Sequence, residues 1–395
     1  MLRTKHVILR RTETRETRDD PTSPGPAGVG PESVPVKVEV EALTAADAAD
    51  LNRRADIEAV ALVFPMKLIR PVELADESQP TASTVAWGIP AVGADTSPFS
   101  GDGVTVAVLD TGIDPNHPAF RGVELVRKNF TSEGDDDAHG HGTHCAGTIF
   151  GRNVDGKRIG VAPGVGTAVI GKVLGSKGGG SDDILTAIEW AIGSGAQVIS
   201  MSLGMDFPGL VSDLEQDGVP TDLATSMALE AYRANILLFE RLASLVAARA
   251  AFTGPCLMVA AAGNESKRSK DPDFVIAVSP PAAADGMVSV AALGPDPAGF
   301  SIASFSNYGA RLSGPGVDVL SARAGGGLTT MSGTSMATPH VAGVAALWAE
   351  KLMKANQFSL QRYTDRLVGS AVTDGLKPGF RPADVGNGMV RAPQN

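Results

Sequence analysis

A chain of 395 residues is long enough for one large domain and a smaller one. Its 43% hydrophobic and 20% charged residues are ordinary for a folded globular protein, which excludes disorder over most of the chain. A formal net charge of -10 argues against a nucleic acid or an anionic membrane as partner, because binding to phosphates requires a basic surface.

The N-terminal sequence does not resemble a targeting signal. Its single apolar triplet, at residues 7–9, is followed directly by arginines, and no later stretch approaches the roughly 20 apolar residues of a membrane span. We therefore expect a cytoplasmic protein, or a secreted one if a leader has been removed. The two cysteines, Cys145 and Cys256, are far apart in sequence and are expected to be free thiols.

Extended and helical patterns alternate near the N-terminus. Residues 5–10 and 36–40 are predicted strands, the second because valines alternate with charged residues. A capping-box pattern opens a predicted helix over residues 44–55. Residues 57–64 are apolar and β-branched enough to form a further strand.

Two breaker-rich segments divide the chain. A Pro/Gly-rich linker at 21–35 lies within the N-terminal part, and a second flexible stretch is predicted at 74–84. We therefore expect a small α/β unit over residues 1–78 and a second domain over residues 79–395.

In the second domain, short apolar runs alternate with helical segments, which is typical of an α/β fold with a parallel sheet wrapped by helices. The predicted central strands are residues 104–109, 169–174, 198–201, 257–261 and 288–292. The predicted helices are a segment beginning at His141 and residues 182–192, 223–251 and 335–354.

Asp110 follows the first of these strands and precedes Thr111 and Gly112. Open α/β folds bind ligands at this edge of the sheet, which makes the carboxylate a candidate functional group. An aspartate at a strand end can equally form a turn or cap a helix.

Three histidines, His139, His141 and His144, lie within six residues. Imidazoles three positions apart share a helical face and could bind zinc. The glycines between them are more typical of a strained helix start, and neither a cysteine pair nor an HExxH pattern accompanies them. His139 and His144 can equally have structural roles.

Ser335 and Asn264 are two further candidates. Ser335 begins an apolar helix after Gly333, where free backbone N–H groups and the positive end of the helix dipole suit a developing oxyanion. Asn264 follows an apolar strand and could direct its amide to the same edge of the sheet as Asp110. Taken singly, the serine could be a helix N-cap and the asparagine a turn residue.

Four motifs in a fixed order make the chain similar to one known family. They are DTGID at 110–114, GHGTHCAGT at 140–148, AAGN at 261–264 and GTSMATPHVAG at 333–343. Together they closely resemble the subtilisin-like serine proteases, over roughly residues 85–350. The cysteine after the helix histidine is similar to that of the proteinase K-like branch.

The resemblance implies a three-layer subtilisin-like fold and a serine endopeptidase that needs no cofactor. It implies that Asp110, His141 and Ser335 form the catalytic triad and that Asn264 stabilises the oxyanion. The order Asp, His, Ser along the chain is the subtilisin order. Protein or peptide substrates would pair with strands on both sides of the cleft. The substrate-binding residues implied are Gly178, Gly179, Gly180, Ser202, Leu203, Gly204, Ala262 and Gly263.

The resemblance also implies that Ala261, Ala262 and Gly263 line the opposite wall of the first specificity pocket and that residues 279–286 form its floor. These residues are small and, apart from Asp285, uncharged, so we expect an apolar residue before the cleaved bond. The N-terminal unit resembles the subtilase pro-domain, which implies that it acts as an intramolecular inhibitor and that self-processing falls between about Ile69 and Ala86. The family's common calcium ligand after the first motif is replaced by Ala119. The acidic run at 135–137 could bind structural calcium differently, but we interpret it as a solvated loop.

The sequence leaves two alternatives open, one for the placement of a segment and one for the function. The segment at 205–255 is longer than the family usually has, and its helix could pack on the body of the protein or on a partner. A regulatory or peptide-binding protein on a catalytically silent scaffold of this kind is the alternative function.

Overall fold

The structure is a computed structural model that describes residues 3–11, 36–72 and 83–395. The predicted linker at 21–35 lies outside the described residues, as does most of the stretch at 74–84.

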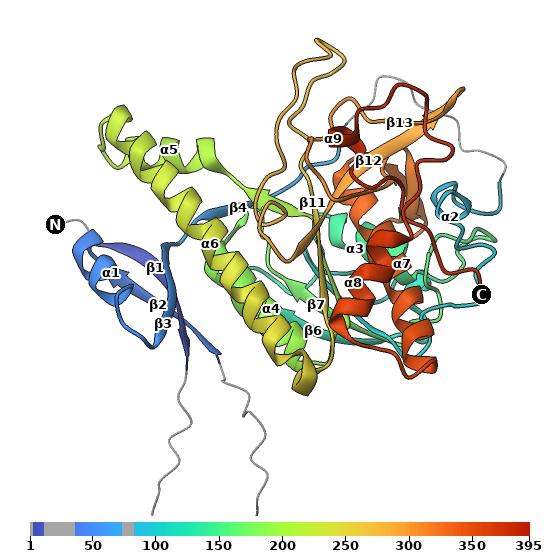
Figure 1. Ribbon diagram of the computed structural model, residues 1–395, viewed down its shortest axis with the longest axis horizontal. Coiled ribbons are helices and arrows are strands. Elements are labelled where there is room, and N and C mark those ends of the chain that lie inside the picture. Colours follow the sequence, from blue (N-terminus) through green and yellow to red (C-terminus); the bar gives the residue numbers. More distant parts are fainter. Residues whose placement is uncertain (1–2, 12–35, 73–82) are drawn as a thin grey trace, which may run out of the picture.

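The N-terminal unit is a three-stranded antiparallel sheet with one helix (Figure 1). Its elements are β1 (Thr4–Arg11), β2 (Val36–Leu43), α1 (Ala45–Leu51) and β3 (Ile57–Leu62), and the strand order is β2-β1-β3. The capping box at Thr44 and Asp47 is present. Helix α1 ends at Leu51, short of the predicted Ala55, because residues 52–56 turn back into β3 through the bonds from Arg54 N to Leu51 O and from Ile57 N to Arg54 O.

A central sheet of eight strands forms the second domain. The five predicted strands are confirmed and lie side by side in the order β12-β11-β9-β5-β7, all parallel. The strands are β5 (Thr105–Asp110), β6 (Glu124–Asn129), β7 (Thr167–Lys172), β9 (Val198–Met201), β11 (Leu257–Ala261), β12 (Met287–Asp296), β13 (Gly299–Ile302) and β14 (Leu312–Pro315). The edge strand β6 escapes prediction because half of it is charged or polar and exposed.

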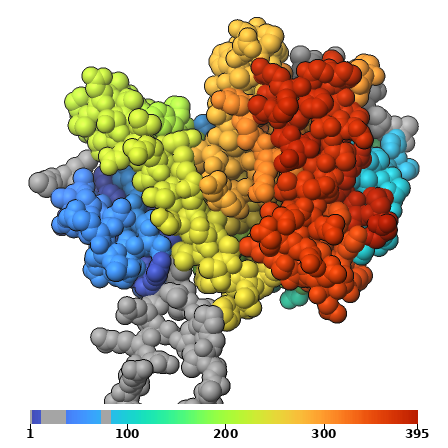
Figure 2. All heavy atoms as spheres, viewed as in Figure 1, coloured from blue at the N-terminus to red at the C-terminus, as the bar shows by residue number. Residues whose placement is uncertain are grey.

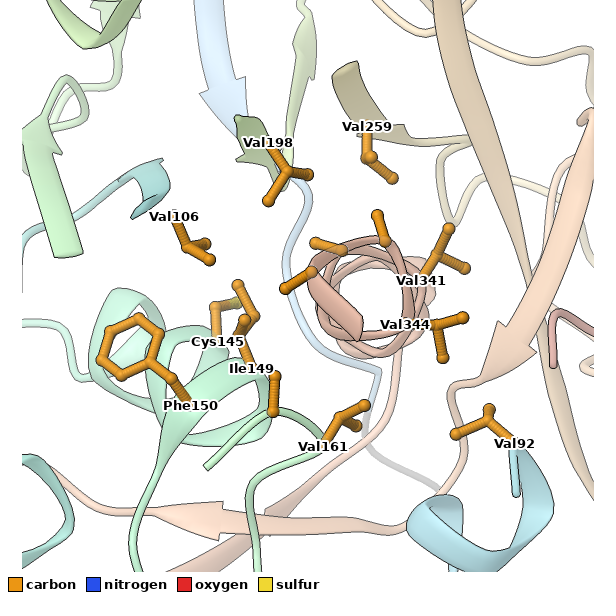
Figure 3. Packing of buried hydrophobic residues seen from close by; sticks show 14 of the residues in the cluster. Val92, Val106, Cys145, Ile149, Phe150, Val161, Val198, Val259, Val341 and Val344 are labelled. Atoms are coloured by element: carbon orange, nitrogen blue, oxygen red, sulfur yellow. The ribbon is translucent and has the colours of Figure 1, made fainter. Parts of the chain in front are cut away.

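Helices cover both faces of this sheet, which confirms the three-layer fold. Along β5, Val106 and Val108 pack into one apolar cluster with α3 (His141–Phe150) and α7 (Thr334–Lys354). Ala107 and Leu109 pack into the other with α4 (Ser181–Gly193) and α6 (Thr221–Thr253). Figure 3 shows α7 end on in the first cluster, with Cys145 of α3 beside it.

The remaining elements are shorter. They are β4 (Pro65–Leu68), α2 (Gly88–Ala91), η1 (Pro118–Phe120), β8 (Gly179–Gly180), β10 (Leu203–Met205), α5 (Phe207–Gln216), β15 (Val319–Ala322), β16 (Leu328–Met331), α8 (Leu360–Gly369) and α9 (Pro382–Val385). Both cysteines are buried free thiols, as expected. None of the helices in the described part of the chain has the length and apolar character required to span a bilayer.

The long helix α6 lies against the N-terminal unit (Figures 1 and 2). One face of the N-terminal sheet, with Val7, Leu9, Ala59 and Ala61, belongs to the same apolar cluster as α4 and α6. The buried Asn235 of α6 donates from Nδ2 to the carbonyl of Leu62 at 2.8 Å. The extra segment therefore packs on the protein's own N-terminal unit, a choice that the sequence left open.

Candidate active site

Asp110 is the last residue of β5, in the interior of the sheet. Its side chain is 1% exposed, and its Oδ1 accepts hydrogen bonds from the Thr111 N–H at 2.7 Å and from Nδ1 of His141 at 2.8 Å. Because a buried carboxylate requires such donors, both bonds hold it facing the imidazole.

His141 is the first residue of α3 and is fully buried. The glycines beside it are required by geometry. Gly140 has a left-handed φ of 85°, and a Cβ on Gly142 would lie 2.2 Å from the carbonyl oxygen of Gly112. Only glycine at 142 lets the start of α3 come close enough to the end of β5 for the bond between His141 and Asp110.

Asp137 organises the loop before α3. It is 7% exposed, so the interpretation of the acidic run as a solvated loop is wrong at this residue. Oδ1 accepts from Thr111 Oγ1 at 2.8 Å, Gly140 N at 2.8 Å and His139 N at 3.2 Å. Oδ2 accepts from Thr143 N at 2.8 Å and Thr143 Oγ1 at 2.6 Å. The sequence analysis missed this role because Asp137 lies three residues before Gly140, the N-cap of α3, and so is not at the position where a capping side chain is recognisable.

Ser335 lies in the first turn of α7 and is fully buried. Its Oγ donates to the carbonyl oxygen of Ile69 at 2.8 Å, and among the described residues Nε2 of His141 has no hydrogen-bond partner. The imidazole and the serine nonetheless belong to one cluster, because Sγ of Cys145 lies 3.7 Å from Nδ1 of His141 and 3.5 Å from the Ser335 carbonyl oxygen. The single hydroxyl hydrogen is thus directed to the chain's own N-terminal segment.

Asn264 follows β11 and reaches the same edge of the sheet. Its Oδ1 accepts from N and Oγ1 of Thr334 at 2.9 and 2.8 Å, which turns Nδ2 toward the cleft, where it donates to the carbonyl oxygen of Arg70 at 2.9 Å. A Cβ on Gly333 would lie 2.9 Å from this Nδ2. A side chain at position 333 would therefore crowd this amide and displace it.

The segment after the N-terminal sheet runs through the cleft as β4. It is paired antiparallel with β10 on one side and with β8 on the other, so that Leu203 faces Leu68, Gly204 faces Lys67 and Gly179 faces Met66. These two strands carry the predicted substrate-binding residues Gly179, Gly180, Leu203 and Gly204, and the predicted Gly178 and Ser202 directly precede them. A Cβ on Gly178 would lie 2.3 Å from the carbonyl oxygen of Met66, so the close approach of the bound strand requires glycine there.

Ile69 sits where the first specificity pocket was predicted. Its N–H is 3.5 Å from the carbonyl oxygen of Ser202, its side chain is 2% exposed, and its Cγ1 would be 3.5 Å from a Cβ on Gly204. Ala262 and Gly263 are buried, and the N–H of Gly263 donates to Oγ1 of Thr334 at 3.2 Å. Their placement in the opposite wall stays a prediction.

Electrostatics make His141 the basic member of the histidine group. Burial alone would lower the pKa of its imidazole, but the adjacent Asp110 carboxylate outweighs this effect and raises that pKa above 6.5. Burial lowers the pKa of His144 to about 3 and that of His340 to about 4, so both are neutral. His144 and His340 bond to the carbonyl oxygens of Val319 and Met336 and are structural.

In the part of the chain that the structure describes, the three histidines do not form a group of potential metal ligands. Within the described ranges, the group of three potential ligands that lies close enough to share an ion is Asp110, His141 and Cys145. That group contains the hydrogen-bonded acid–base pair, and neither His139 nor His144 belongs to it. At the predicted calcium position, Ala119 is buried in the apolar core and offers no side-chain ligand.

Comparisons with known proteins agree with this geometry. Residues 101–388 match the subtilase family, Peptidase_S8. The chain is 34% identical over 320 residues to the thermostable alkaline protease of Halalkalibacterium halodurans, covering 79% of this chain and 73% of that protein. It is 36% identical over 262 residues to subtilisin-like protease 6 of Trichophyton equinum, covering 62% of this chain and 52% of the relative. The chain thus spans most of the bacterial relative and about half of the fungal one.

Proposed function

Since the chain belongs to the subtilase family and is therefore a serine endopeptidase acting on proteins or peptides, we propose that Asp110, His141, Ser335 and Asn264 carry out the hydrolysis. The observation that carries this assignment is that Ser335 and Asn264 contact the main chain of Ile69 and Arg70, while Cys145 lies between Ser335 and the hydrogen-bonded pair of His141 and Asp110.

The proposed reaction follows from these positions. Oγ of Ser335 attacks a peptide carbonyl while Nε2 of His141 takes its proton, and Asp110 holds the imidazole tautomer and stabilises the cation that forms. The tetrahedral oxyanion is held by Nδ2 of Asn264 and the N–H of Ser335. His141 then protonates the leaving amine, and water hydrolyses the acyl-enzyme by the reverse sequence. Every group in this scheme is a protein side chain or backbone amide, so we propose that catalysis needs no metal.

We propose further that residues 1–78 form an inhibitory pro-domain. The proposal is supported by β4, which fills the strand positions on both sides of the cleft, and by the bond of Ser335 Oγ to a carbonyl of that segment. While this segment is bound, the hydroxyl does not donate to His141 and no substrate can pair with β10. Cleavage and departure of the segment would restore both.

The proposed processing site is the bond between Ile69 and Arg70. It is the bond whose carbonyl oxygen contacts the serine hydroxyl, within the predicted interval. Asn264 donates one residue further on, to the Arg70 carbonyl, so reaction at Ile69 requires this amide to move to the neighbouring oxygen. The apolar Ile69 also agrees with the apolar residue expected before the cleaved bond.

Intact mass and N-terminal sequencing of the purified full chain test the proposal. We expect a new N-terminus at Arg70, and a start at Pro71 would reject the assigned bond. A fluorophosphonate should label the processed wild type and Ser212→Ala, a change on the exposed face of α5, but not Ser335→Ala. A correctly folded wild type that stays whole and unlabelled would support the silent binding protein instead.

A further inference from the structure

Asp206 is an acidic residue at the start of the extra segment at 205–255. Asp206 directly follows β10, and its N–H donates to the carbonyl oxygen of Pro65 at 3.0 Å. It therefore continues the pairing of the cleft with the bound strand β4. This inference rests on the proposed function, because it treats β4 as occupying the cleft as a substrate does.

The side chain of Asp206 faces one residue of the bound strand. Its Oδ1 lies 3.0 Å from Nζ of Lys67, which stands two residues before Ile69. The backbone pairing of Lys67 with Gly204 aims the lysine at this carboxylate. A substrate paired in the same register would present its residue at this position to Asp206.

The side chain of Asp206 is held by contacts with its own helix α5, which do not involve the bound strand. It is the N-cap of α5, and its Oδ1 accepts from the N–H of Gly209 at 3.2 Å. A Cβ on Gly209 would lie 2.5 Å from the other carboxylate oxygen, so glycine there leaves room for this orientation. The start of a helix also favours the charged carboxylate.

The neighbouring positions of the bound strand are distinguished by burial instead. Phe64 and Met66 are at most 1% exposed and belong to an apolar cluster, and Ile69 is 2% exposed. Lys67 is partly exposed, with 41% of its side chain accessible. Since the pocket around Lys67 is open, it cannot select a substrate residue by size. The charge of Asp206 can select it instead.

Other ionisable groups line the same cavity of about 650 Å³. They are Lys177, His139, Glu265 and, from the bound segment, Arg70. Glu265 accepts a hydrogen bond from Nδ2 of Asn307, which holds its carboxylate. Asp206 is the acid that forms an ion pair with Lys67.

We propose that Asp206 is a specificity-determining residue that favours substrates with lysine or arginine two residues before the residue whose carbonyl is attacked. The substrate class is thus a peptide with an apolar residue at the cleaved bond and a basic residue two positions upstream. Partly exposed ion pairs of this kind correspond to roughly a twofold to fivefold preference over a neutral side chain. An acidic residue at the same position is repelled and is cleaved more slowly than the neutral one.

Three quenched peptides that copy residues 64–70, with Lys, Gln or Glu at the position of Lys67, test this with enzyme obtained by processing of the full chain. For the wild type we expect kcat/KM in the order Lys, Gln, Glu, with smaller ratios at high salt. Asp206→Asn, which keeps a capping side chain, should bring the three rates together, and Asp206→Lys should reverse their order. Asp213→Asn on the exposed side of α5 is the control and should behave as the wild type.

The outcomes separate this inference from the proposed function. If wild type and Asp206→Asn show the same ratios between the three peptides, the inference is wrong while the endopeptidase assignment stands. If the full chain neither processes itself nor cleaves any of the three peptides, the proposed function fails together with the inference.

Discussion

Replacement of Asp137 by asparagine removes the centre of the network that connects β5 with the start of α3. The asparagine amide keeps one oxygen acceptor, but its NH₂ group is a donor and faces N–H or O–H groups that are donors themselves. If its nitrogen faces Thr143, two bonds to a buried charged acceptor are lost. Each such bond is worth about 1.5–3 kcal/mol, so we expect the free energy of unfolding to fall by about 3 kcal/mol or more.

The same change should slow catalysis without weakening substrate binding. Asp137 holds Thr111, beside Asp110, and Gly140, beside His141, so its loss disturbs both ends of the acid–base pair. Small displacements of reacting groups cost up to about 100-fold. We expect kcat to fall by about 10- to 100-fold with KM nearly unchanged. Urea unfolding and steady-state kinetics measure the two effects.

Acid titration provides a further check on Asp137. Burial would raise the pKa of this carboxyl, but hydrogen bonds from Thr143 and Gly140 outweigh it and lower that pKa below 3.8. A carboxylate with a lowered pKa stabilises the fold above its unfolded-state value, and this contribution is lost as pH falls through the folded-state value. The stability gap between wild type and Asp137→Asn should therefore close below about pH 3.8.

The exposed Asp136 provides the matched control, since Asp136→Asn makes the same chemical change one residue away. It should leave both stability and turnover unchanged. The reasoning is refuted if Asp137→Asn unfolds at the wild-type urea concentration and turns over at the wild-type rate.

Three further changes test other parts of the site. Hydrolysis should be lost as pH falls through the raised pKa of His141, above pH 6.5, and a wild-type pH–rate profile with its acid limb well below 6.5 would contradict this. Asp110→Asn should lower kcat by about 10⁴. Asn264→Ala should lower kcat by about 10²–10³ with little change in KM, and steady-state kinetics showing an unchanged kcat would exclude it as oxyanion donor. Asn235→Ala should weaken inhibition by the cleaved N-terminal fragment by about 1–3 kcal/mol, because the Leu62 carbonyl loses a buried partner. The inhibition constant of the fragment measures this effect, and Thr225→Ala on the exposed face of α6 is the control.

The predictions were most accurate for elements whose sequence carries a strong local pattern of apolar residues. The five central strands and the helices starting at His141 and near Ser335 match the structure within a few residues, because continuous apolar runs in a parallel sheet and glycine-flanked helix starts are local signals. Strand β4 was not separated from the strand predicted at 57–64, because its pairing partners, β8 and β10, lie more than 100 residues away and each is only two or three residues long.

Sequence alone determined the family, the three-layer fold and the four candidate catalytic residues, because the motifs around them are contiguous and carry the required glycines and helix starts. Only the tertiary structure decided which partner each group has: Asp137 with Thr111 and Thr143, Ser335 with the Ile69 carbonyl, and Asp206 with Lys67. These contacts join distant segments, and their existence depends on distances between side chains and on burial that no local pattern encodes.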